Sequence, residues 1–99
     1  MKQSAIIITI SLLTGCATTL SDKALSVQLA DTNMVKECQL LNTVEGSSTV
    51  SGLMISQGIQ NARNEAIEKA AELGATHIVI TNSIGGSSPY VSGNAYKCN

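Results

Sequence analysis

Residues 57–73 carry the strongest structural pattern in the chain, an apolar stripe that recurs every three or four residues. The stripe is formed by Ile59, Ala62, Ala66, Ala70 and Leu73. This spacing is typical of an amphipathic helix that buries one face. Ser56 is placed to cap the start of the helix, and Gly74 is placed to end it in a left-handed conformation. Because most of the stripe is alanine, we expect the helix to lie close against a sheet.

Strands are predicted on both sides of this helix. Alternating apolar residues favour a strand over residues 24–29, and residues 34–45 form a second extended stretch whose apolar pattern requires either a bulge or two buried faces. After the helix, β-branched residues predict a central strand over 76–81, and residues 90–98 form a last strand. The order β-β-α-β-β predicts an α+β fold, a small mixed sheet of about four strands with one helix packed on one face.

The composition excludes several classes of function. The 99 residues include six Lys and Arg, seven Asp and Glu, two Tyr and no Phe or Trp, and the net charge is -1. A nucleic-acid-binding domain would show a clustered excess of basic residues, so we expect no nucleic-acid partner. No apolar run reaches the roughly 18 residues that a membrane-spanning helix needs.

The N-terminus has the pattern of an export signal. A positive start is followed by an apolar stretch over residues 5–13 that is too short to span a bilayer. Leu13-Thr14-Gly15-Cys16 comes next and resembles the bacterial lipobox. The resemblance implies cleavage between Gly15 and Cys16 and attachment of diacylglycerol and a further acyl chain, such as palmitate, to Cys16. Three acyl chains anchor a protein stably without spanning the membrane.

This signal predicts three parts of the chain: a signal peptide over residues 1–15, a lipidated cysteine with a short tether over 16–23, and a periplasmic domain over 24–99. In lipoproteins of this kind, an Asp directly after the modified cysteine favours retention in the inner membrane. Here that position is Ala17. We therefore expect the protein on the periplasmic face of the outer membrane, held by its lipid.

Two cysteines, Cys38 and Cys98, remain after Cys16 is used for lipid. An even pair in an exported domain indicates one disulfide, because the periplasm is oxidising. The alternative is a small-ligand or metal site formed by Cys38, Cys98 and His77, since thiolate and imidazole bind zinc or copper. No close pair of ligands accompanies these three residues, and both interpretations stay open at this point.

Three segments together resemble a family of small bacterial lipoproteins that is classed as a domain of unknown function and is similar in architecture to the RcsF envelope-stress sensor. The segments are CQLLNTVEG at 38–46, AIEKAAELGATHIV at 66–79 and GNAYKC at 93–98. The resemblance covers residues 34–98. It implies a monomeric, disulfide-stapled periplasmic domain with no enzyme activity. RcsF itself reports envelope damage to an inner-membrane partner, but it has two disulfides and a long linker.

We therefore expect a non-enzymatic cell-envelope lipoprotein with an interaction or sensing domain, an envelope protein as partner, and no cofactor. The expected contact surface is the loop that contains Val50, Leu53, Met54 and Ile55, because loops on a rigid scaffold carry recognition. The rival interpretation is that these side chains only cover the open end of the sheet. Hydrolysis would need a base beside a nucleophile. His77 has no Ser or Asp at a marked spacing, so we expect no catalytic residue.

Overall fold

The computed structural model of the protein describes residues 19–99, so the predicted signal peptide, Gly15 and Cys16 lie outside the described residues. The described part contains, in order, α1 (Asp22–Leu25), β1 (Gln28–Leu29), the 3-10 helix η1 (Thr32–Val35), β2 (Gln39–Ser47), the 3-10 helix η2 (Gly52–Met54), α2 (Ile55–Glu72), β3 (His77–Ile84) and β4 (Tyr90–Lys97). The predicted α+β fold and its β-β-α-β-β order are confirmed.

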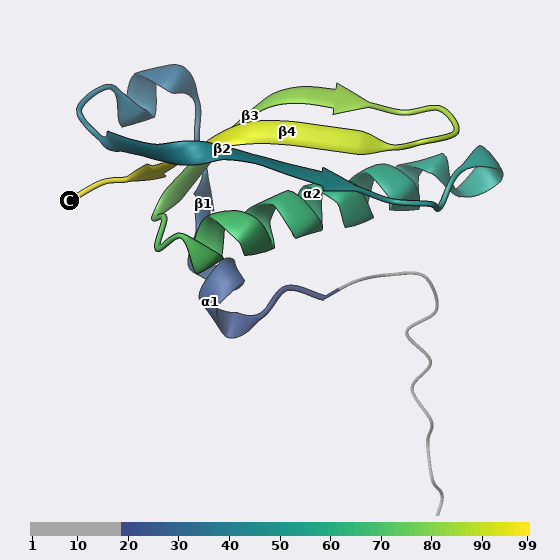
Figure 1. Cartoon of the computed structure of the whole chain (residues 1–99), viewed down its shortest axis with the longest axis horizontal. Helices are drawn as coiled ribbons and strands as arrows, with labels where there is room; N and C mark the ends of the chain where they lie inside the picture. Colours follow the sequence, from purple (N-terminus) through teal and green to yellow (C-terminus); the bar gives the residue numbers. More distant parts are fainter. Residues whose placement is uncertain (1–18) are drawn as a thin grey trace, which may run out of the picture.

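The sheet has four strands in the order β1-β3-β4-β2. β1 pairs with β3 in parallel, and the other two pairings are antiparallel, so the sheet is mixed as predicted. α2 runs along one face of the sheet, and η1 lies on the opposite side (Figure 1). Within residues 19–99, no helix has the length and apolar character needed to cross a membrane.

The core lies between α2 and the sheet and is built mainly from small and β-branched side chains. Its buried members include Val44, Ala62, Ala66, Ile67, Ala70, Ile78, Val91 and Ala95. The alanines let α2 approach β2 closely, and Gly46 of β2 lies directly against the backbone of the helix at Ala62. The alanine-rich stripe therefore has the role that its pattern predicts.

The strand register gives the sheet two different faces. In β4, Val91, Gly93 and Ala95 are buried, whereas Tyr90, Ser92, Asn94 and Tyr96 alternate with them and remain partly exposed. Cross-strand partners share a face of a sheet. Asn82 and Glu45, which both pair with Ser92, therefore lie on the face turned away from α2. We call this surface the open face.

The outer edge of β2 is closed by side chains rather than by another strand. The backbone N–H of Thr43 donates to the side-chain oxygen of Asn42, at 2.8 Å. Four residues later, the backbone N–H of Ser47 donates to a carboxylate oxygen of Glu65 on α2, also at 2.8 Å. Two donors that an added strand would need are thus already used.

The prediction of a strand over residues 24–29 is wrong for its first part. Residues 22–25 form the helical turn α1, because the Ser21 side chain accepts from the backbone N–H of Ala24 and caps that turn. Only Gln28 and Leu29 pair with the sheet. A local side-chain cap competes with extended structure, and here it overrides the apolar alternation.

The ends of other helices and strands differ from the predictions by only a few residues. The extended stretch expected from residue 34 starts at Gln39, because Asp31 caps the 3-10 helix η1 through the backbone N–H of Met34. Of the two alternatives for this stretch, a bulge is present, between Leu40 and Asn42. Ser56 is not the cap of α2, which begins at Ile55 directly after η2. Gly74 has a φ of 85°, so the predicted left-handed helix end is confirmed.

Candidate functional site

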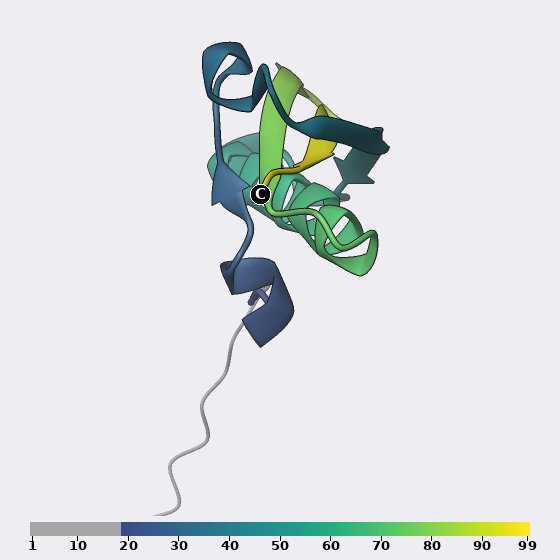
Figure 2. The same cartoon turned by 90° about the vertical axis from the view of Figure 1, so that its left-hand side faces the viewer.

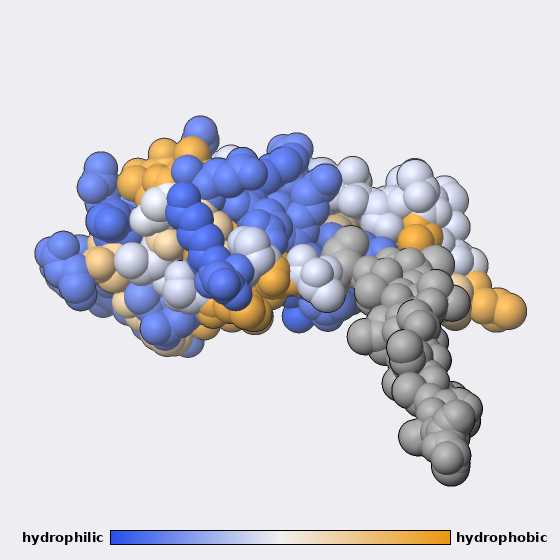
Figure 3. Space-filling model, turned by 90° about the horizontal axis from the view of Figure 1, so that it is seen from below, coloured by the Kyte–Doolittle hydropathy of each residue, from blue (hydrophilic) through white to orange (hydrophobic). Residues whose placement is uncertain are grey.

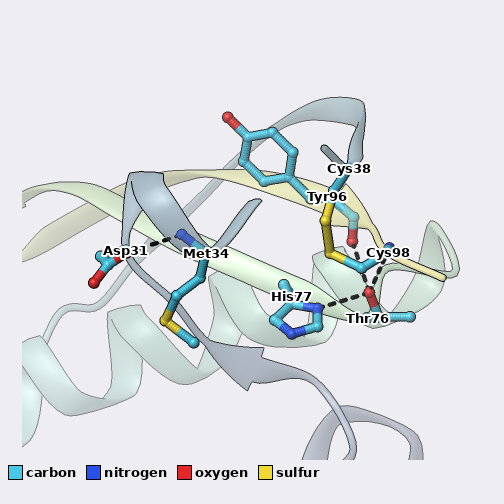
Figure 4. The surroundings of a disulfide bond; sticks show 7 residues. All are labelled: Asp31, Met34, Cys38, Thr76, His77, Tyr96 and Cys98. Atoms are coloured by element: carbon cyan, nitrogen blue, oxygen red, sulfur yellow. Dashed lines mark hydrogen bonds between the residues drawn. A yellow bond between two sulfur atoms is a disulfide. The ribbon is translucent and has the colours of Figure 1, made fainter. Parts of the chain in front are cut away.

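Cys38 and Cys98 form a disulfide at one end of the sheet. Their Cα atoms are 4.6 Å apart, which is within the range that a disulfide bridges without backbone movement. The bond joins the start of β2 to the residue after β4, because these two strands are antiparallel neighbours (Figure 4). The predicted disulfide is therefore part of the structure.

Thr76 and His77 lie beside the disulfide, as Figure 4 shows. The Thr76 hydroxyl accepts from the backbone N–H of Cys98 at 2.8 Å and lies 2.8 Å from Nδ1 of His77. It also lies 3.4 Å from the backbone carbonyl oxygen of Tyr96. A threonine hydroxyl has one donor and two acceptor positions, so it can make all three contacts when Nδ1 of His77 carries the ring hydrogen.

The disulfide and the hydrogen bonds of Thr76 engage the side chains that a metal site or a hydrolytic site would need here. Both sulfur atoms are in the disulfide, so in this state neither Cys38 nor Cys98 offers a thiolate to a metal. Among residues 19–99, no three His, Cys, Asp or Glu side chains gather in a metal-binding cluster. The hydroxyl next to His77 holds the C-terminal backbone, which is a structural use of that pair.

Exposed apolar side chains gather at the opposite end of the molecule. The side chain of Leu53 is fully exposed, and that of Met54 is 52% exposed. Together with Ile55, they form a surface that we call the apolar tip. Figure 3 shows hydrophobic atoms protruding at the end of the molecule where η2 lies.

The apolar tip is built from two segments that are distant in the sequence. A shallow groove of about 520 Å³ separates them and is lined by Ser51, Gly52, Ile55, Gly86 and Ser87. A Cβ added at Gly85 would make ordinary contact with Ile55 and Ile59, so the β3–β4 turn lies against the start of α2. The expected contact residues Leu53, Met54 and Ile55 lie here, and Val50 precedes them as a half-buried residue.

The sequence-based prediction did not include Gly86 and Ser87 of the β3–β4 turn, which line the groove together with Ile55. A signal for this end of the molecule was nevertheless present in the sequence. No Lys, Arg, Asp or Glu occurs between Glu45 and Arg63 or between His77 and Lys97. These two charge-free segments meet at the tip. Depletion of charge together with exposed apolar side chains is typical of the centre of an interface.

Glu45 and Tyr90 form a smaller polar site on the open face. Loss of water contact raises the pKa of the Tyr90 phenol, and a hydrogen bond to Glu45 and the negative charge of Glu45 raise it further, while a hydrogen bond with Ser92 lowers it. Next to this pair, Glu45, Glu65, Lys69 and Tyr90 line a pocket of only about 100 Å³ at the edge of the sheet formed by β2. That volume is below the 300 Å³ or so of a typical small-molecule site.

Comparison with protein families gives one match over most of the chain. Residues 18–98 match the family described as "Domain of unknown function (DUF4156)". The chain belongs to the DUF4156 family. This membership agrees with the resemblance to a family of unknown function, and it assigns no activity to the chain. No curated protein matches the chain in sequence.

One solved structure supports the fold of this DUF4156 domain. The solution NMR structure of a secreted protein from Salmonella typhimurium LT2 superposes on it with a TM-score of 0.55. The two chains are 19% identical, and the match covers 93% of this chain and 88% of that chain. At this identity, the likeness extends to the fold alone.

Proposed function

We propose that this DUF4156 protein is a non-enzymatic lipoprotein of the bacterial cell envelope. In this proposal, Cys16 carries the lipid, and the described domain lies on the periplasmic face of the outer membrane. The domain acts by contact with an envelope component through the apolar tip. Its architecture is RcsF-like in the sense that one disulfide-linked α+β domain follows a lipidated N-terminus.

The disulfide between Cys38 and Cys98 is the observation that carries the proposal. Structural disulfides persist in exported proteins and are rare in the bacterial cytosol. Export is also what the apolar N-terminal stretch and the lipobox-like Leu13-Thr14-Gly15-Cys16 predict. Two independent features of the chain therefore favour the same compartment, and Ala17 after Cys16 favours the outer membrane.

The contact role rests on the apolar tip. Leu53 is fully exposed in the middle of the 3-10 helix η2, and Gly52 before it has a φ of 68°. The turn thus holds a large apolar side chain in water, although nothing in the fold requires that exposure. Exposed apolar surface of this kind marks interaction sites. The charge-free surroundings favour a partner whose own surface is uncharged.

Intact-mass spectrometry of the protein extracted from its native membrane tests the anchored state. We expect loss of residues 1–15, an acyl mass on Cys16, and alkylation of Cys38 and Cys98 only after reduction. An unmodified N-terminus would overturn the lipoprotein proposal. Free alkylation of both cysteines before reduction would instead overturn the exported, disulfide-linked state.

Crosslinking in intact cells tests the contact role. A photoreactive amino acid at Leu53 should capture an envelope partner, and the same group at Leu40 is the matched control. Leu40 is also an exposed leucine, but it lies in β2 near the disulfide end. Equal capture from both positions would show that the apolar tip has no special role.

A further inference from the structure

The N-terminal end of the described chain is fixed to α2. The backbone N–H of Ser21 donates to one carboxylate oxygen of Glu68 at 2.7 Å, and the Ser21 hydroxyl donates to the other at 2.9 Å. The same hydroxyl accepts from the backbone N–H of Ala24. One residue earlier, Leu20 packs against the core. We call the two bonds between Ser21 and Glu68 the N-terminal clamp.

The clamp lies on the side of the molecule that is turned away from the open face. In Figures 1 and 2, α1 lies on the α2 side of the sheet, whereas η1 lies on the opposite side. A chain that enters here reaches the domain next to α1 and α2. Asn82, Ser92 and Glu45 of the open face point in the other direction.

The chain between the predicted anchor and the clamp is short. Leu20 is four positions after Cys16 in the sequence, and even a fully extended chain over four positions spans only about 14 Å. The 18-residue helix α2 is about 27 Å long. A lipid on Cys16 would therefore hold the domain within less than its own length of the bilayer, with too little chain for the domain to turn over.

The surface beside the clamp is compatible with a lipid headgroup region. Leu25, at the end of α1, is 65% exposed although it is a large apolar residue, and Lys23 lies in the same turn. Figure 3 shows this side of the molecule, where hydrophobic patches alternate with hydrophilic atoms. Amphipathic surfaces of this kind rest at the boundary between headgroups and acyl chains.

We propose that the α1 side of the domain rests on the membrane that holds the Cys16 lipid, and that the N-terminal clamp fixes this orientation so that the open face points away from the bilayer. The occupant of the α1 side is a phospholipid surface. This inference rests on the proposed lipidation of Cys16 and adds to it a defined docking side and a positioning role for Glu68.

Tryptophan fluorescence tests the orientation, because the natural chain contains no Trp. The full-length lipidated protein is reconstituted into vesicles of phosphatidylethanolamine and phosphatidylglycerol with brominated acyl chains. We expect quenching and a blue shift for Leu25→Trp. We expect neither for Asn82→Trp, which is an equally simple exposed substitution on the open face. Equal quenching of the two proteins would overturn the docking side.

The clamp is tested in the Leu25→Trp background. Glu68→Ala should lose the quenching, whereas Glu72→Ala, one turn further along α2, should keep it. Circular dichroism of both variants confirms that the fold is retained. Quenching that survives Glu68→Ala would overturn the role of the clamp.

Intact mass, measured first on every preparation, separates the two proposals. A protein without an acyl group would overturn both the lipoprotein function and the docking side. An acylated protein whose Leu25→Trp fluorescence is not quenched would overturn only the docking side.

Discussion

Gly46 of β2 lies so close to Ala62 of α2 that a Cβ at position 46 would overlap the Ala62 carbonyl oxygen. We therefore expect Gly46→Ala to separate the helix from the sheet and to lower the free energy of unfolding by about 1–3 kcal/mol, as overpacking usually does. Urea unfolding measures this change. The control is Gly85→Ala, whose Cβ would make only ordinary contacts. Equal stability of the two variants would contradict this account of the packing.

Removal of the disulfide should destabilise the domain substantially. The bond closes a loop with a sequence separation of 60 between Cys38 and Cys98. In the chain-entropy model, a disulfide that closes a loop of this size raises the free energy of unfolding by about 4 kcal/mol, because the crosslink limits the conformational freedom of the unfolded chain. Unfolding in denaturant with and without a reductant measures the loss. In the double variant Cys38→Ser, Cys98→Ser the reductant should have no effect.

Thr76→Val should lower the free energy of unfolding by about 1–2 kcal/mol, because it leaves the partly buried N–H of Cys98 without its acceptor. Thermal or denaturant unfolding gives the value. Thr76→Ser keeps the hydroxyl and should retain most of the stability. If serine is as destabilising as valine, the methyl group rather than the hydrogen bond explains the effect.

The Tyr90 phenol should ionise above its ordinary pKa of 10.0, since loss of water contact and the neighbouring Glu45 both favour the protonated form. In the unfolded chain Tyr90 ionises first, so this contribution to stability is present below pH 10 and is lost as the pH rises beyond it. Ultraviolet titration in a Tyr96→Phe background follows Tyr90 alone. Glu45→Gln should lower its pKa, and Glu37→Gln should leave it unchanged.

The sequence predicted the C-terminal two-thirds of the fold well because several signals agree there. The apolar stripe predicts the helix α2, and Gly74 predicts the position of its C-terminal end. The β-branched residues after Gly74 predict β3. The predicted pairing of Cys38 with Cys98 needed only the count of cysteines and the export signal. None of these features depends on the detailed geometry of distant residues.

The N-terminal segment was mispredicted because a contact distant in the sequence decides its structure. Alternating apolar residues between Ala24 and Leu29 favoured a strand, but Ser21 caps a helical turn and binds Glu68 on α2. The β3–β4 turn was missed at the apolar tip for a related reason. Gly86 and Ser87 share a groove with Gly52 and Ile55 only because the fold brings these distant segments together.

The closed edge of β2 has a consequence under the proposed lipidation of Cys16, which would confine the protein to a membrane. Molecules anchored in one plane meet far more often than molecules in free solution, and bare strand edges then join into fibres or continuous sheets. Here the donors of Thr43 and Ser47 are occupied by Asn42 and Glu65. A neighbouring copy finds these two donors already used, which opposes the addition of a strand at this edge when crowding brings the domains together.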